Sequence, residues 1–268
     1  MTKTQTRLIK HPFHIVNPRP WPMLRATGAF YMARGICSSI NQFETYVILW
    51  KIGFFLVLIS IYQWWRDVRR EATFQGKHTI RVEGGIRLGM VLFIVREVFF
   101  FLSFFWAFYH SSLRPSRDVG SRWPPAGVVP IPPFGVPLLN TALLLSSGAS
   151  ITWAHRAIII SNPTEANISL LVTMGLGAAF TVIQIIEIYC CGFTMSDSVF
   201  GRTFYIATGF HGVHVVVGTL FITVAWWRHE NAHMTRSHHF GFEASAWYWH
   251  FVDVVWLFLY ISLYWWRY

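Results

Sequence analysis

The stretch that decides the fold is HHFGFEASAWYWHFVDVVWLFLYISLYWW, residues 238–266, which is long enough to cross a bilayer and still carries three ionisable groups. These groups are Glu243, His250 and Asp253, and because spacings of seven and three return to the same side of a helix, they are predicted to share one face. Ionisable groups are costly in lipid, so this face is expected to meet protein or a wet cavity. Interhelical hydrogen bonding that fixes packing is the favoured interpretation, and a functional role is the alternative.

Composition predicts a membrane protein. The chain is 54% hydrophobic and 18% aromatic, with 13% charged residues, whereas about a quarter of a soluble domain is charged. Only helices and closed barrels span lipid, and the apolar runs are too long and too weakly alternating for barrel strands. We therefore predict an all-α integral membrane protein, a seven-transmembrane helix bundle that forms a single domain over residues 1–268. The expected spans lie near residues 21–39, 43–65, 86–110, 136–158, 166–190, 200–227 and 241–266.

Basic residues in the loops predict the orientation, because they are retained on the side of insertion. They favour an N-terminus in the matrix or cytoplasm and a C-terminus on the outer side. Most of the net charge of +10 then comes from the loop residues that set the orientation, and anionic lipid headgroups would balance it. Dispersed charges without a binding motif argue against nucleic acid as a partner. The N-terminal side would carry Lys3, Arg7, Lys10, Arg19, Arg66, Arg69, Arg70, Lys77, Arg81, Arg87, Arg156, Arg228 and Arg236, and the other side Arg114, Arg117, Arg122, Arg202 and Arg267.

Histidines are numerous, but their spacing does not favour a metal or haem site on this chain. His211 and His214 are three residues apart on one helix face, so they could share a metal but could not supply opposite axial ligands of one haem. The cysteines form no spaced pair that a copper thiolate centre would need. His238 and His239 lie near a helix start, where we interpret them as a solvated interfacial pair.

Glu97 is the acid with the most apolar sequence neighbourhood. It precedes the run Val-Phe-Phe-Phe-Leu-Ser-Phe-Phe-Trp, and desolvation there disfavours the charged form of a carboxyl. Such an acid can relay protons or donate a hydrogen bond to a neighbouring helix. Arg96 precedes it, but adjacent residues on a helix diverge by about 100° and need not pair.

Aromatic and basic residues gather where the second span ends, over residues 62–79. Aromatic side chains at headgroup depth beside basic groups suit a phospholipid. Arg228 and His233 follow the sixth span on the same predicted side, and two basic loops could hold a lipid phosphate, with Arg bidentate to its oxygens. Ordinary positive-inside charge explains the same residues equally well.

A transporter or channel is the main rival class on residues alone. Its intramembrane relay would be drawn from five groups, but the chain has no repeated halves and no matching broken helices, which are typical of transporters. The five groups are Glu97, Glu187, His211, His250 and Asp253.

Several long motifs resemble subunit III of cytochrome c oxidase, of the haem-copper oxidase family. The match is collinear and covers most of the chain, and it is weakest near residues 23–60, where Arg25 and Arg34 interrupt the first span. The motifs are YQWWRD (62–67), EATFQG (71–76), FFWAFYHSSL (104–113), VPLLNT (136–141), ITWAH (151–155), ATGFHGVH (207–214) and nearly all of residues 238–266.

The resemblance implies a seven-helix subunit without haem or copper of its own, in which a two-helix group and a five-helix group enclose a lipid-filled cleft. Glu97 corresponds to a buried carboxyl that supports proton uptake in the family, and Arg96 and Lys77 depart from the family pattern. His211, His214, Glu243, His250 and Asp253 are then expected to be polar packing residues. The expected lipid-headgroup residues are Trp65, Arg70, Glu71, Thr73, His78, Arg228 and His233, with Trp106 and His110 beside a further lipid.

The implied function is that of a non-catalytic core subunit of cytochrome c oxidase, which supports the stability and proton intake of the catalytic subunit. Its implied partners are catalytic subunit I, which with its neighbours carries the haem and copper, the other complex IV subunits, membrane phospholipids and a respiratory supercomplex. The motif wording favours the mitochondrial inner membrane over a bacterial plasma membrane.

Overall fold

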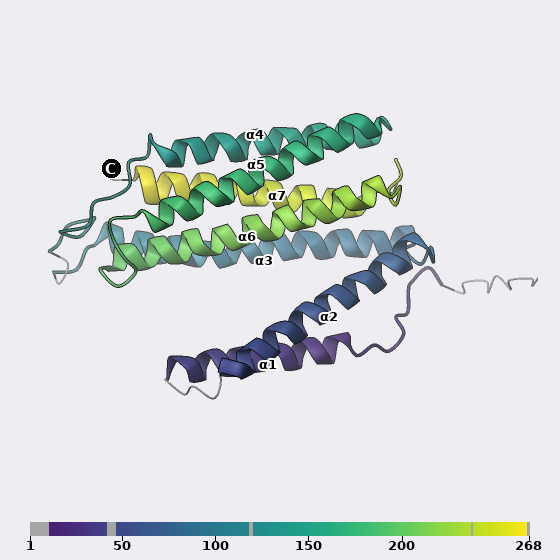
Figure 1. The fold of residues 1–268 in the computed structure, drawn as a ribbon, viewed down its shortest axis with the longest axis horizontal. Coiled ribbons are helices and arrows are strands. Elements are labelled where there is room, and N and C mark those ends of the chain that lie inside the picture. Colours follow the sequence, from purple (N-terminus) through teal and green to yellow (C-terminus); the bar gives the residue numbers. More distant parts are fainter. Residues whose placement is uncertain (1–10, 42–46, 118–119, 237, 267–268) are drawn as a thin grey trace, which may run out of the picture. The chain divides into compact units, whose positions relative to one another are not determined.

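The chain forms seven long helices in a computed structural model that describes residues 11–41, 47–117, 120–236 and 238–266 (Figure 1). These ranges contain no strand, so the predicted all-α class is confirmed. The predicted start of the second span at residue 43 lies outside the described residues. The helices are α1 (Trp21–Ile40), α2 (Val47–Thr73), α3 (Ile80–Leu113), α4 (Val136–Ile159), α5 (Pro163–Tyr189), α6 (Val199–Glu230) and α7 (Phe240–Leu259), which a π-helical segment, η3 (Tyr260–Trp265), continues.

Five of the helices are long and apolar enough to cross a membrane: α2, α3, α5, α6, and α7 with η3. The other two helices, α1 and α4, contain polar residues that lower their hydropathy. Arg25 and Arg34 lie in α1, whereas α4 carries Asn140, Ser147 and Ser150, all of which are buried. The polar content of α4 therefore belongs to the bundle interior, where side-chain hydrogen bonds join membrane helices.

The described chain divides into two compact units, unit 1 (Met1–Ile86) and unit 2 (Arg87–Tyr268). The division falls inside α3, so α1 and α2 belong to unit 1 and α4 to α7 belong to unit 2. This matches the predicted two-helix and five-helix groups, except that residues 80–86 of α3 are grouped with unit 1. The assignment of residues 1–268 to a single domain stays a prediction.

Unit 1 is a pair of closely approaching helices. A Cβ atom added to Gly53 would lie 2.6 Å from the Gly28 carbonyl oxygen, and one added to Gly35 would lie 2.5 Å from the Trp50 backbone nitrogen. Small residues thus let the α1 and α2 backbones meet, as is common between membrane helices. At one end the Trp21 indole donates to Asp67 Oδ2 at 2.7 Å.

Unit 2 is built around α7, which is its most enclosed long helix. Of the apolar window that would cross the membrane, 61% is buried in α7 with η3, against 33% in α5 and in α6. The Trp249 ring occupies the space that side chains would take at Gly177 and Gly218, where added Cβ atoms would lie 2.7 and 2.8 Å from it. One aromatic side chain therefore holds α5, α6 and α7 in register.

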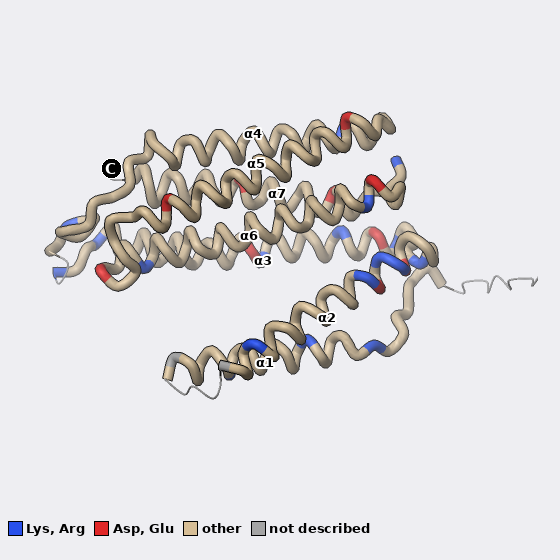
Figure 2. Tube along the Cα trace, viewed as in Figure 1, with Lys and Arg blue, Asp and Glu red and all other residues tan. Residues whose placement is uncertain are grey.

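Charged residues lie mostly toward the ends of the helices, as Figure 2 shows. The adjacent pair Arg96 and Glu97 is an exception, because it lies near the middle of α3. This position makes the pair the first candidate for a functional group in the bundle.

Candidate functional site

Glu97 lies on α3 and is buried, with 8% of its surface exposed. One carboxylate oxygen, Oε1, accepts from Arg96 Nε at 3.0 Å, and the other, Oε2, lies 3.0 Å from His214 Nε2 on α6. Adjacent residues on a helix need not pair, but Arg96 and Glu97 do pair in this structure. The long Arg96 side chain bends back to the carboxyl, with the guanidinium 4.7 Å from the centre of the Phe93 ring.

The contact between Glu97 and His214 requires a shared proton. His214 Nδ1 lies 2.7 Å from the Phe210 carbonyl oxygen, which can only accept, so Nδ1 carries a hydrogen. A hydrogen bond at Nε2 then needs either a second proton on the imidazole or a protonated carboxyl. The pair therefore holds one proton between the carboxyl and the imidazole.

Aromatic rings surround this proton-sharing pair. The His214 ring centre lies 4.9 Å from that of Phe101 and 6.1 Å from that of Phe100 on α3. On α7, Tyr248 stacks on the same imidazole, with an angle of 14° between the ring planes. These rings hold the imidazole at the carboxyl and limit access of water to it.

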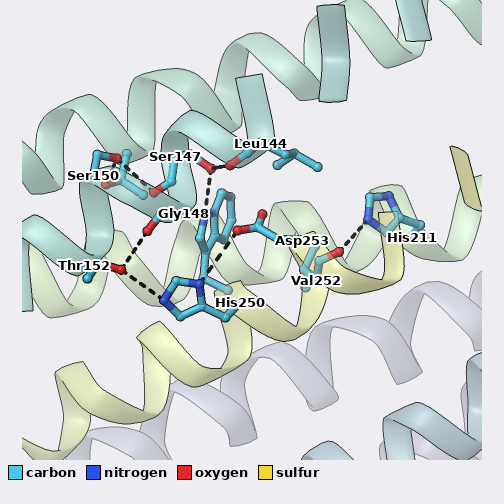
Figure 3. Close-up of polar contacts among 11 residues, drawn as sticks. Leu144, Ser147, Gly148, Ser150, Thr152, His211, His250, Val252 and Asp253 are labelled. Carbon is cyan, nitrogen blue, oxygen red and sulfur yellow. Dashed lines mark hydrogen bonds and ion pairs between the residues drawn. The ribbon is translucent and has the colours of Figure 1, made fainter. Parts of the chain in front are cut away.

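The α7 residues predicted to share a polar face are drawn in part in Figure 3. Asp253 is buried, with 6% of its surface exposed, whereas His250 is exposed. His250 Nδ1 lies 4.0 Å from Asp253 Oδ2, and its Nε2 lies 3.5 Å from Thr152 Oγ1 on α4. A Cβ atom at Gly148 would lie 2.6 Å from Asp253 Oδ2, so this glycine admits the carboxyl against α4 (Figure 3).

Glu243, the third residue of that face, lies in the first turn of α7 and pairs with Arg87 of α3. Its other oxygen faces His239, at 3.3 Å. The interpretation of His239 as a solvated interfacial residue is wrong, because only 8% of its surface is exposed, whereas His238 is exposed.

His211 is fully enclosed between α5, α6 and α7. Its Nε2 lies 3.2 Å from the Val252 carbonyl oxygen (Figure 3), and the rings of Phe180 and Trp256 cover the imidazole. His211 and His214, which were predicted as packing residues, thus have separate partners and do not converge on one point.

The predicted lipid-headgroup residues of unit 1 lie at the C-terminal end of α2 and just after it. Trp65 and Arg70 are exposed, whereas Glu71 is buried in an ion pair with Arg19. Trp65 lines a hollow of about 220 Å³ together with Arg25, Ile61, Trp64 and Val68. Thr73 and His78 are half-buried, and the His78 ring centre lies 6.5 Å from that of His14. Sequence reasoning missed Arg19 as the partner of Glu71, because 52 residues separate them.

The other expected lipid-headgroup residues belong to unit 2. Arg228 and His233 lie at the end of α6, where the His233 backbone N–H donates to the Arg228 carbonyl at 2.9 Å. Near the end of α3, Trp106 and His110 are exposed, and their rings stack with centres 5.1 Å apart. The last two therefore form one continuous aromatic surface.

The sequence of the chain is similar to those of several known proteins. The sequence profile described as cytochrome c oxidase subunit III matches residues 11–268. Cytochrome c oxidase subunit 3 of Aedes aegypti is 53% identical over 256 residues, which cover 96% of this chain and 97% of that protein. The protein of the same name from Petromyzon marinus is 54% identical over 256 residues, with the same coverage. The one from Lemur catta is 54% identical over 256 residues, covering 96% of this chain and 93% of its own.

Proposed function

The chain belongs to the cytochrome c oxidase subunit III family, and from this premise we propose that it supports the stability and proton intake of catalytic subunit I without carrying a catalytic centre. The chain is a subunit of cytochrome c oxidase, an oxidoreductase complex, and the other subunits of complex IV are its partners. It is a multi-pass protein of the mitochondrial inner membrane. The proposal assigns haem and copper to partner subunits, and it extends to packing within a respiratory supercomplex.

The observation that carries the proposed role in proton intake is the pairing of Glu97 with His214. A buried carboxyl and an imidazole that share one proton form a local proton reservoir. Arg96 stabilises the charged carboxylate through two donors on one guanidinium. The reservoir can therefore buffer a neighbouring proton pathway without itself reducing oxygen.

We expect Glu97→Gln to leave the initial rate of electron transfer near normal and to shorten the active lifetime of the enzyme several-fold. Glutamine keeps the size of the side chain but cannot accept the shared proton. The measurement is oxygen consumption and proton uptake by the purified complex through prolonged turnover. Glu230→Gln, at the exposed end of α6, is the control, and equal lifetimes of both variants would contradict the proposal.

Phospholipid binding is the second part of the proposal. It is supported by the exposed Trp65 and Arg70 of unit 1, by Arg228 in unit 2, and by the stacked rings of Trp106 and His110. Exposed aromatic and basic side chains together suit a lipid with an anionic headgroup. An N-terminus in the matrix and a C-terminus in the intermembrane space would place the basic ends of α2 and α6 on one side.

Arg228→Ala is expected to reduce co-purifying phospholipid. A hydrogen bond to a charged group contributes about 1.5–3 kcal/mol, so the affinity for the lipid should fall by roughly ten- to a hundredfold for each bond lost. Lipid mass spectrometry of the purified complex measures this change. Arg202→Ala, at the opposite end of α6, should leave the lipid content unchanged, and full occupancy in Arg228→Ala would refute the assignment.

A further inference from the structure

Two histidines and one carboxylate converge where α4 ends and α7 begins. His155 comes from the last turns of α4, His239 immediately precedes α7, and Glu243 lies in the first turn of α7. One ligand atom from each of the three lies within 4.8 Å of the other two. Among the described residues, this is the only such group of histidine, cysteine and carboxylate side chains.

The group is pre-oriented for a cation. His239 Nδ1 lies 3.1 Å from the Thr235 carbonyl oxygen, which can only accept, so Nδ1 carries a hydrogen, and a cation could take the place of a proton between Nε2 and Glu243 Oε1. A backbone carbonyl that fixes the tautomer in this way is typical of histidines that bind metals. Two imidazoles and one carboxylate with a remaining open position are a ligand set for zinc.

The distances fit a small tetrahedral ion. Two ligands each about 2.0 Å from a tetrahedral zinc are separated by about 3.3 Å, and His239 Nε2 lies 3.3 Å from Glu243 Oε1. The His155 ring centre lies 5.6 Å from that of His239, and the two rings meet at 62°. The ligand atoms of the three residues lie within 4.8 Å of one another, and His239 and Glu243 already have the expected separation, so only His155 would need to turn inward.

Arg87 sets the manner of coordination. Its guanidinium pairs with Glu243 Oε2 and lies 5.1 Å from the centre of the Phe240 ring. Because the Arg87 guanidinium already pairs with Oε2, only Oε1 is left for a metal, and the Glu243 carboxylate would bind through that one oxygen. This arrangement also lowers affinity through charge repulsion, and it predicts a site that fills at raised zinc concentration.

We propose that His155, His239 and Glu243 form a zinc-binding site that joins the end of α4 to the start of α7. The proposal is independent of the role assigned to Glu97 and of lipid binding, because it uses none of those residues. Bound zinc would fix the loop after α6 to α4.

The first test uses the native complex. After treatment with a chelator, the complex is modified with diethyl pyrocarbonate with and without added zinc chloride, and each histidine is followed by peptide mass spectrometry. A metal-bound nitrogen cannot react, so zinc should slow modification of His155 and His239 and leave the exposed His238 unaffected. Equal modification of all three with and without zinc would overturn the proposal.

The second test uses variants of the assembled complex. His155→Gln and Glu243→Gln should each lower the zinc content after equilibrium dialysis by about one ion per chain, and His238→Gln should not. Identical zinc content in all three would overturn the proposal. Assembly is checked by haem content, and if a variant does not assemble, the protection experiment on the native complex decides.

Discussion

Replacing Trp249 with alanine is expected to lower the free energy of unfolding of the helix bundle in unit 2 by about 3–5 kcal/mol. The Trp249 side chain is fully buried and contacts the backbone surface at Gly177 and Gly218. The residues that face this space on α5 and α6 are glycines, which have no side chain to fill it. The cost is mainly lost dispersion contact, because lipid tails are as apolar as the bundle interior.

Trp249 also has a polar contact that alanine would remove. Its indole N–H donates to Ser147 Oγ on α4 at 2.9 Å. Trp249→Phe keeps much of the ring but loses this donor, so it should fall between the wild type and the alanine variant. The measurement is the midpoint of detergent-induced unfolding of the purified complex. Phe258→Ala on the exposed side of α7 is the matched control, and a loss equal to that of Trp249→Ala would contradict the prediction.

Gln184→Leu is expected to destabilise the same bundle by about 2–4 kcal/mol, since each stranded buried polar group costs about 1–3 kcal/mol. Gln184 on α5 is the centre of a buried network. It accepts from Asn140 Nδ2 on α4 at 3.0 Å and donates to the Tyr264 hydroxyl at 3.2 Å. That hydroxyl in turn donates to Glu187 Oε2 at 3.2 Å. Leucine fits the volume but leaves the Asn140 amide without a partner.

A double-mutant cycle separates this cost from a general packing defect. Asn140→Leu combined with Gln184→Leu removes both partners, so the double variant should lose less than the sum of the two single variants. Additive losses would show that the hydrogen bond contributes nothing. Val182→Leu on the exposed side of α5 controls for the added leucine, and unfolding is again followed in detergent.

The sequence predicted the helices better than their ends. Apolar length indicates how much chain crosses the hydrocarbon, and α4 is expected at residues 136–158 and found at Val136–Ile159. By contrast, α2 continues to Thr73 and α3 begins at Ile80, beyond the predicted bounds of residues 65 and 86. Arg, Glu and Ala are good helix formers, so a helix continues through polar sequence that a hydropathy argument excludes.

The partners of the candidate site were less predictable than its members. The sequence singled out Glu97 by its apolar surroundings and His214 by its spacing from His211, but their contact joins positions 117 residues apart. Periodicity assigns a residue to a face of its own helix and says nothing about which face of another helix it meets. The same limit applies to Glu243, whose neighbours Arg87 and His155 come from two other helices.

The central position of α7 has a consequence for biogenesis. The helix that fills the middle of unit 2 leaves the ribosome after α4, α5 and α6, so these three helices are synthesised before the Trp249 side chain that packs between α5 and α6. Until then the grooves at Gly177 and Gly218 are open to lipid, and the polar side chains of α4 lack partners such as Trp249 and Trp256. A chain that stops before residue 240 would therefore be inserted in the membrane with these grooves open and these polar side chains without partners. Cellular quality control could recognise the truncated chain by them.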